Sequence, residues 1–551
     1  MPYKIGISAG WWKIGKDPAL LGLAQKFAGW GGTAGVQFIQ ADIDTTSEFY
    51  EPLLKQQMKR VVKEMGIEGG LHGEEGELMS LESAEKRLWE QSHLRLIETV
   101  KHSVDFGMTL VNIHSSNTLF ISFVEAQHRL QGYYYPVVGP DGRPLTYLGK
   151  ENPETKEEAK KHVSSIIERS ATWDSELDKL KKSKYAEIEK RVREIIEKER
   201  KQGRAVDETA ARNYVEQQIR IEINEIQNSK EFQYSVLEKM SDSDHEKYLL
   251  NDGEYGAYII AATYMRETND PLWSTIAGGG KPEDTYTTNE KDFCAAISAK
   301  YIEGHLRVKD HPLNKKHLDG MSILEYLEKS KTHLLFETPQ TGEGREALMR
   351  MFDPLHIYYM IKKINSPRVK MCIDFEHMLA HKLNPDTEIP KYPGDIGKEI
   401  MLFHLGKPIP YWGTAHIPIA IGSRAQEIIY KWLYMIRKKG FKDGYMIFER
   451  GGGRSGKGNT PLEVVESSVW ALRQIKEFLE KDIKPDELPE QFYGISEQNK
   501  ETWARQLVNM REHAWDPLEG LLTIPEEKHT FLGKAATDKG KAKEWDRAKY
   551  R

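Results

Sequence analysis

Eight side chains that bind divalent metals well stand at or just beyond the ends of short apolar runs. They are histidines and carboxylates, which Zn²⁺, Mn²⁺ and similar ions take as ligands. The set is His72, His114, Glu337, Asp374, His377, His404, His416 and Glu449. One such histidine alone is more often a satisfied polar residue than a ligand, so the repetition carries the argument. Two ions bridged by a carboxylate such as Glu337 or Glu449 activate a water and stabilise a leaving oxygen.

The apolar runs before these side chains have the length and composition of buried parallel strands. Eight strands are predicted, and they end near Ser8, Gln40, His72, His114, Glu337, Asp374, His404 and Glu449. Helical patterns separate most of them, at Pro18–Trp30, Tyr50–Met65, Leu81–Phe106, Glu343–Ile364, Ala425–Lys439 and Leu462–Leu479. This alternation predicts an α/β protein with a (β/α)8, or TIM, barrel, whose active site lies at the carboxyl ends of the strands.

The connection after the fourth strand is far too long for one barrel unit. It runs for 223 positions from His114 to Glu337 (337 − 114), which predicts a large, mainly helical insertion. Pro153–His245 is dense in Lys and Glu and predicts long exposed helices, arranged as a hairpin. Tyr255–Leu327 is more apolar and is expected to pack onto the barrel. Because the insertion leaves a strand end, a role as a lid or substrate clamp is a hypothesis.

The chain is therefore divided into four parts. Residues 1–118 form the first part of the barrel, 119–330 the inserted helical domain, 331–485 the second part of the barrel, and 486–551 a C-terminal extension with a basic tail.

The composition says more about the cellular compartment of the protein than about its function. The net charge of −5 argues neither for nor against nucleic acid, because a local basic patch can hide within it. The two cysteines, Cys294 and Cys372, suit a reducing interior. A signal peptide is not evident, and no apolar stretch approaches the roughly 18 residues of a membrane span. A cytoplasmic protein without membrane contact is expected, and the oligomeric state is left open.

The order of several short motifs resembles a known family. The motifs are Ile5–Ser8, Leu71–Gly73, Val111–His114, Phe336–Thr338 followed by Gly342 and Gly344, Cys372–His377, Phe403–Leu405 and Ile447–Glu449. Together they resemble the xylose-isomerase-like TIM-barrel superfamily and, within it, endonuclease IV, the nuclease of apurinic and apyrimidinic sites. The resemblance covers roughly residues 3–118 and 331–480 and does not extend into the insertion.

The resemblance implies a site of two or three divalent ions, with Zn²⁺ favoured over Mn²⁺ and Mg²⁺. His72, His114 and Glu337 are implied to hold one ion. Glu337 is implied to bridge to a second ion bound by Asp374, His404 and Glu449. A third is implied at His377 and His416. The family's Asp-x-His pair is here Thr414-Ala415-His416, and its DNA-opening wedges have no clear match near Gln40–Thr45 or Glu74–Glu75. These departures affect the third ion and abasic-site recognition.

Two enzymatic functions fit these residues. The first is a metal-dependent phosphodiesterase, similar to an AP endonuclease, that acts on nucleic acid. The alternative is a sugar or sugar-phosphate isomerase or epimerase of the same superfamily, in which one ion is held by Glu337, Asp374, His404 and Glu449. Glu337 and Glu449 are the catalytic candidates in both, and in the alternative they exchange protons at a sugar carbon. A barrel that serves only as a binding or assembly module is a third hypothesis, and the nearly complete ligand pattern argues against it.

Two further segments are candidates for substrate binding. Gly451–Gly458 nearly matches a nucleotide phosphate loop, but Gly458 stands where a Ser or Thr would bind Mg²⁺. Arg454 and Lys457 in this loop suit a phosphate group, although a plain surface loop explains them equally well. Trp11 and Trp12 follow the first strand and are candidates to stack on a base or sugar ring, with core packing as the alternative.

Overall fold

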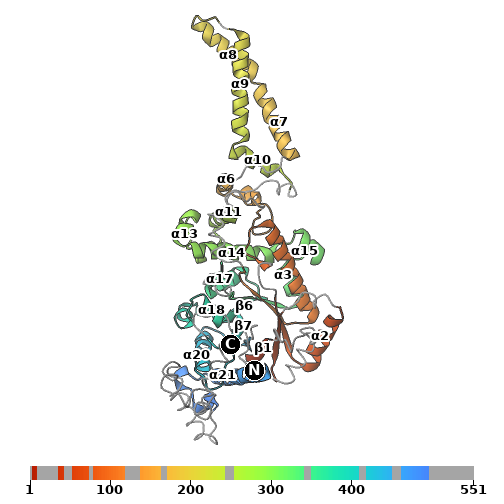
Figure 1. Ribbon diagram of the computed structural model, residues 1–551, viewed down its shortest axis with the longest axis vertical. Coiled ribbons are helices and arrows are strands. Elements are labelled where there is room, and N and C mark those ends of the chain that lie inside the picture. Colours follow the sequence, from red (N-terminus) through yellow and green to blue (C-terminus); the bar gives the residue numbers. More distant parts are fainter. Residues whose placement is uncertain are drawn as a thin grey trace, which may run out of the picture. The chain divides into compact units, whose positions relative to one another are not determined.

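Eight parallel strands close into one barrel (Figure 1). The computed structural model describes residues 3–8, 35–42, 52–73, 79–117, 137–162, 170–205, 207–241, 254–340, 349–408, 417–449 and 461–494. The strands are β1 (Tyr3–Ser8), β2 (Phe38–Asp42), β3 (Glu68–His72), β4 (Leu110–His114), β5 (His333–Glu337), β6 (Val369–Asp374), β7 (Ile400–Leu405) and β8 (Gly444–Phe448). Each pairs with the next in the sequence, and β8 pairs with β1. The predicted (β/α)8 barrel is confirmed.

The barrel interior is built in layers. An apolar layer consists of Phe38, Leu110, Leu335, Cys372, Leu402, Tyr445 and Ile447, all of them buried. Side chains alternate between the two faces of a strand, so the residue two positions further on points to the same interior. In five of the strands that position holds Gln40, Asn112, Glu337, Asp374 or His404, and directly after β8 it holds Glu449. A polar layer therefore lies directly above the apolar one, at the carboxyl ends of the strands.

The helices that alternate with the strands are α2 (Pro52–Met65), α3 (Lys86–Phe106), α17 (Pro354–Ile364), α18 (Phe375–Ala380), α19 (Pro385–Glu388), α20 (Arg424–Lys438) and α21 (Pro461–Glu480). Helices α2, α20 and α21 lie within two residues of their predicted bounds, α3 begins at Lys86 and not at Leu81, and the short α18 and α19 were not predicted. The helix predicted over Glu343–Ile364 is too long, because residues 349–353 are not helical. Asp353 caps α17 by accepting a hydrogen bond from the Leu355 N–H at 2.8 Å, and the residue before a proline disfavours helix. The helix predicted at Pro18–Trp30 lies outside the described residues.

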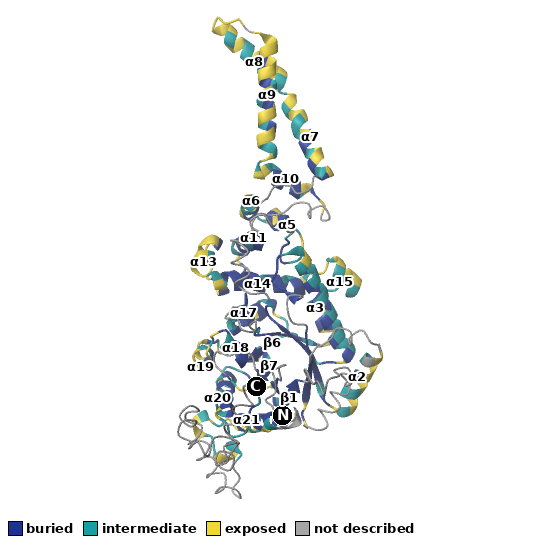
Figure 2. Cartoon of the chain, viewed as in Figure 1, coloured by how far each residue is buried: buried dark blue, intermediate teal, exposed yellow. Residues whose placement is uncertain are grey.

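Between β4 and β5 the described residues form helices. They are α5 (Thr146–Glu151), α6 (Pro153–His162), α7 (Ala171–Tyr185), α8 (Ile188–Lys201), α9 (Glu208–Gln227), α10 (Lys230–Lys239), α11 (Glu254–Glu267), α12 (Pro271–Ile276), α13 (Pro282–Thr288), α14 (Glu290–Arg307), α15 (Pro312–His317) and α16 (Ile323–Ser330). Helices α7, α8 and α9 form a hairpin with a narrow apolar core of its own, which includes Leu177, Val192, Val215 and Ile219. Figure 2 shows the exposed residues that cover most of its outer faces.

The later helices of this segment contact the loops at the carboxyl ends of the strands. Glu254 of α11 accepts hydrogen bonds from the Ser83 hydroxyl at 2.6 Å and from Arg350 at 2.6 Å. Ser83 lies beyond β3, and Arg350 lies beyond β5. Helix α14 packs against α17, a helix of the barrel. The insertion is thus tied to the loops that border the polar layer.

The chain forms two compact units, residues 1–485 and 486–551. In the second unit the structure describes a short 3₁₀ helix, η8 (Glu490–Tyr493). Among the described residues, every helix falls short of the length and apolar character that crossing a lipid bilayer requires.

Candidate metal centre

Four side chains from four adjacent strands converge in the polar layer. Glu337, Asp374, His404 and Glu449 each offer one ligand atom, and these atoms all lie within 4.8 Å of one another. The Nδ1 atom of His404 is 2.8 Å from Glu337 Oε1 and 2.7 Å from Glu449 Oε2. Ligands that lie about 2.1 Å from one ion, at right angles to each other, are about 3 Å apart. The spacing of these atoms therefore fits a divalent ion.

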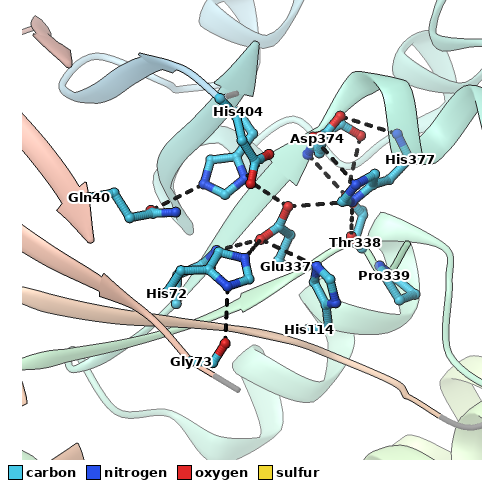
Figure 3. Close-up of polar contacts among 12 residues, drawn as sticks. Gln40, His72, Gly73, His114, Glu337, Thr338, Pro339, Asp374, His377 and His404 are labelled. Carbon is cyan, nitrogen blue, oxygen red and sulfur yellow. Dashed lines mark hydrogen bonds and ion pairs between the residues drawn. The ribbon is translucent and has the colours of Figure 1, made fainter. Parts of the chain in front are cut away.

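A second group shares Glu337. The ligand atoms of His72, His114 and Glu337 also lie within 4.8 Å of one another. Glu337 Oε2 is 3.1 Å from His72 Nε2 and 3.9 Å from His114 Nε2. The same oxygen accepts a hydrogen bond from the Asn112 amide. Figure 3 shows Glu337 between the histidines, so this carboxylate is the centre of the cluster.

Local backbone structure fixes the direction of Asp374. It is the last residue of β6 and the N-cap of α18, and its Oδ1 accepts hydrogen bonds from the N–H groups of Glu376 at 2.6 Å and His377 at 3.1 Å. Its own N–H donates to the Thr338 hydroxyl at 3.0 Å. Because Oδ1 is used in the cap, Oδ2, which lies 3.6 Å from His377 Nε2, is the oxygen that would bind an ion.

The electrostatics of the cluster also suit a cation. Burial raises the pKa of Glu337, but His404, His72 and His114 outweigh it and hold that pKa well below its usual range. Burial lowers the pKa of His404, yet the neighbouring Cys372, Glu337 and Glu449 raise it well above its usual value. Three carboxylates thus face one imidazole in the four-residue group. Glu337 Oε1 and His404 Nδ1 are both buried and lie 2.8 Å apart. A carboxylate oxygen and an imidazole nitrogen that converge in this way fit a bound ion.

His377 lies beside the cluster with different partners. Its Nδ1 donates to the Thr338 carbonyl at 2.8 Å, and its Nε2 is 3.6 Å from Asp374 Oδ2. It belongs to none of the ligand groups found in the described part of the chain. His416, its expected partner at a third ion, lies outside the described residues, as do Trp11, Trp12, Arg454 and Lys457. The third ion and the substrate contacts stay predictions.

Two polar residues of the cluster were missed in the sequence. Gln40 and Asn112 are fully buried and contact His404 and Glu337, respectively. Both stand two positions after an apolar residue of the interior layer, Phe38 or Leu110. Strand periodicity around the better-marked ligands is the signal that identifies them.

Comparisons with known proteins give similarity at a low level. No protein-family model matches the chain, and no curated protein matches it. Among solved structures, a D-psicose 3-epimerase in the presence of D-fructose has 10% identity and a TM-score of 0.40, over 86% of this chain and 99% of its own. An L-ribulose 3-epimerase has 8% identity and a TM-score of 0.40, over 87% and 96%.

A 3-keto-D-glucoside 4-epimerase from E. coli has 9% identity and a TM-score of 0.35, over 86% of this chain and 99% of its own. These three structural neighbours are sugar epimerases, and a closeness to endonuclease IV is not shown by them. Likenesses at this level define neither a family nor an activity for this chain. The chemistry of the site therefore has to come from its own geometry.

Proposed function

We propose that this protein is a metal-dependent isomerase or epimerase of a sugar or sugar phosphate, with one catalytic divalent ion. Glu337, Asp374, His404 and Glu449 would hold the ion. When bound, such an ion polarises the carbonyl and hydroxyl oxygens of a substrate and makes the adjacent C–H bond more acidic. The proposal extends the chemistry of these four side chains and does not depend on the low-level structural likenesses.

The observation that carries the proposal is the unequal use of the two oxygens of Glu337. Oε1 faces His404 Nδ1 at 2.8 Å, within the four-ligand group. Oε2 accepts the Asn112 amide and lies 3.1 Å from His72 Nε2. The Asn112 hydrogen bond occupies one of the two lone pairs of Oε2, so the four-ligand group on the Oε1 side is the fuller candidate site for an ion. We therefore take this group as the site of the single catalytic ion.

Glu449 is the ligand best placed to contact a substrate. It is 8% exposed, whereas Glu337 and His404 are 0% and Asp374 is 1% exposed. A carboxylate at the rim of the site accepts a proton from a substrate carbon and returns it to the same or a neighbouring carbon. Glu337 is the second candidate for proton exchange. His72 and His114 lie next to it, with their Nε2 atoms 3.1 and 3.9 Å from Glu337 Oε2.

Solvent exchange tests the proposal directly. The purified protein is stripped of metal, reloaded with Mn²⁺, and incubated with ketoses, aldoses and their phosphates in D₂O. We expect about one bound ion per chain and deuterium at one substrate carbon, detected by NMR, with Glu449→Gln losing most of the exchange. Glu238→Gln, on α10, is the control, because Glu238 bonds to Lys156 instead. Absence of exchange with every sugar would contradict the proposal.

A specific observation supports a second candidate, the metal-dependent phosphodiesterase acting on nucleic acid. The second group, His72, His114 and Glu337, shares Glu337 with the first and is able to hold another ion beside it. Two such ions stabilise both the attacking and the leaving oxygen in phosphoryl transfer. Its test is incubation with abasic, nicked and single-stranded DNA and with RNA, in Mn²⁺ or Zn²⁺. Two or more ions per chain, and cleavage lost in His114→Ala, would favour this candidate over the isomerase.

A further inference from the structure

The two nitrogens of the His404 ring have different partners. Nδ1 faces the carboxylates of Glu337 and Glu449, at 2.8 and 2.7 Å. On the other side of the ring, Nε2 lies 3.2 Å from the side-chain oxygen of Gln40 (Figure 3). His404 is fully buried. Its ring is therefore held between a cluster of ligands and one amide.

Gln40 reaches His404 because of its place in β2. It follows Phe38 on the inward face, and its backbone is level with Ser8 of β1 and Gly70 of β3. The side chain is 0% exposed and belongs to none of the ligand groups found among the described residues. Strand β2 thus adds a supporting side chain to the centre and no ligand.

The chemistry of the contact has one consequence for His404. An amide oxygen only accepts hydrogen bonds, so His404 Nε2 has to carry the hydrogen. A histidine that binds a metal is neutral, and a neutral imidazole with its hydrogen on Nε2 has its lone pair on Nδ1. That lone pair lies on the side of the ring where Glu337 and Glu449 converge. The ring of His72, whose centroid is 5.8 Å away at an interplanar angle of 29°, limits the tilt of His404.

We propose that Gln40 is a positioning residue that fixes His404 in the tautomer with hydrogen on Nε2 and so makes Nδ1 the metal-binding atom. A second partner that orients a metal-bound histidine typically changes metal affinity by ten- to a hundredfold. The inference rests on the metal site of the proposed function, and it is independent of the substrate. It gives strand β2, which supplies no ligand, a role in the metal site.

Three variants separate this role from general packing. Gln40→Met removes the acceptor and keeps an unbranched side chain, and we expect it to weaken Mn²⁺ or Zn²⁺ binding by ten- to a hundredfold in competition with a chromogenic chelator. Gln40→Glu keeps an acceptor for the same N–H and should bind within a few fold of wild type. Gln426→Met is the control, since Gln426 is an equally buried amide that accepts the Gly422 N–H at 2.7 Å on α20. It should leave metal affinity unchanged.

A spectroscopic measurement reports the bound nitrogen without any activity assay. The protein is produced with histidine labelled with nitrogen-15 and is loaded with an NMR-active cadmium isotope. The spin coupling between the metal and a ring nitrogen should then be found at His404 Nδ1, both in wild type and in Gln40→Glu. Coupling to His404 Nε2, or metal affinity equal to wild type in a folded Gln40→Met protein, would overturn the role assigned to Gln40 but not the metal site. A wild-type protein that takes up no divalent ion would overturn both the metal site and this assignment. The wild-type spectrum keeps the test decisive even where Gln40→Met fails to fold.

Discussion

Glu337 connects two groups of side chains that arise from both halves of the barrel. Its Oε1 faces His404 of β7, and its Oε2 faces His72 of β3 and Asn112 of β4. Few other residue types serve both directions, because a carboxylate has two acceptor oxygens and a negative charge that fits surrounding imidazoles. The charge is stable here although the group is fully buried, since the histidines more than compensate for the loss of solvent.

Replacing Glu337 by Gln removes the negative charge of the side chain and keeps its size and shape. An ion at a concentration of 100 times its Kd stabilises the folded state by about 2.7 kcal/mol. We expect Mn²⁺ or Zn²⁺ to raise the melting temperature of the wild-type protein, measured by differential scanning fluorimetry. Treatment with a chelator should reverse this rise. Glu337→Gln should lose this gain, because an amide binds such ions poorly and places N–H donors toward His404 or His72. An equal gain in the variant would show that the ion binds elsewhere.

Between elements, the loops that surround the site are tied to the insertion by a buried ion pair. Arg350 is 2% exposed and lies 2.6 Å from Glu254 of α11. Glu254 also accepts hydrogen bonds from the Ser83 hydroxyl and the Ala84 N–H. Burial raises the pKa of Glu254, but Arg350 and these hydrogen bonds hold it below its ordinary value. The loops after β3 and β5 therefore share one charged anchor.

Removing one partner of this pair should be far more damaging than removing both. Arg350→Met leaves a buried carboxylate without its cation and is expected to lower the free energy of unfolding by about 3–5 kcal/mol. Adding Glu254→Gln should restore part of that loss, because the amide oxygen still accepts the Ser83 and Ala84 hydrogens. Urea unfolding followed by circular dichroism measures both. Lys179→Met, which breaks the exposed pair with Glu176, should cost under about 1 kcal/mol. Equal costs for the single and double variants would contradict this account.

The contact between α3 and α14 contains a second group of buried titratable side chains. His93 of α3 and His305 of α14 are both fully buried, and their Nδ1 atoms are 3.1 Å apart. Trp89 stacks on both rings, and the His93 Nε2 is 2.7 Å from Asn314 Oδ1. Burial lowers the pKa of His93 to about 4, partly opposed by Asn314, and it lowers that of His305 well below its usual value.

Acid should therefore weaken the fold through these histidines. Their folded-state pKa values lie below the unfolded value of about 6.5, so the unfolded chain binds more protons between about pH 4 and 6.5. Stability is then highest above that window and falls as the pH drops through it, by about 3 kcal/mol for His93 alone at pH 4. Urea unfolding at several pH values should give a smaller decrease for His93→Gln than for wild type. Identical pH dependence in the two proteins would exclude His93 as the source.

At the scale of the whole molecule, the sequence predicts the barrel better than the details of its site. Five of the predicted strand ends, from Ser8 to Asp374, are the last residues of the observed strands. Buried parallel strands are recognisable because they are short apolar runs, and the polar residue that ends each run marks the active end of a barrel. Strand β2 was harder to place, since it runs two residues past Gln40 to Asp42.

The parts that the sequence left open depend on distances between segments far apart in the chain. Nothing in the local pattern says that Asn112 bonds to Glu337, 225 positions later, or that Gln40 faces His404. The start of α17 at Pro354 was missed because the acidic and apolar residues before it suit a helix equally well, and the Asp353 cap decides the matter. The four-part division of the chain and the identity of the ion stay predictions.

The hairpin of α7, α8 and α9 is the part of the described insertion with the least connection to the metal centre. Its apolar core contains only residues of α7 to α9 together with Phe232 of α10. The side chains of Lys184 and Glu222 lie 3.2 Å apart, so a short Gly-Ser linker between these positions can replace residues 185–221. The replacement removes the exposed Tyr185, Tyr214 and Ile221.

We expect this shortened protein to bind divalent ions with wild-type affinity and to keep the thermal stabilisation they give, because contacts within the hairpin and contacts within the barrel are formed independently. Isothermal titration with Mn²⁺ and melting with and without the ion measure both quantities. Leu335→Ala, which opens a cavity in the apolar layer beneath the ligands, is the contrasting variant and should lower stability by about 2–5 kcal/mol. Loss of ion binding in the shortened protein would instead mean that the hairpin helps to hold the ends of β4 and β5 in register, and that the insertion is part of the metal centre's support.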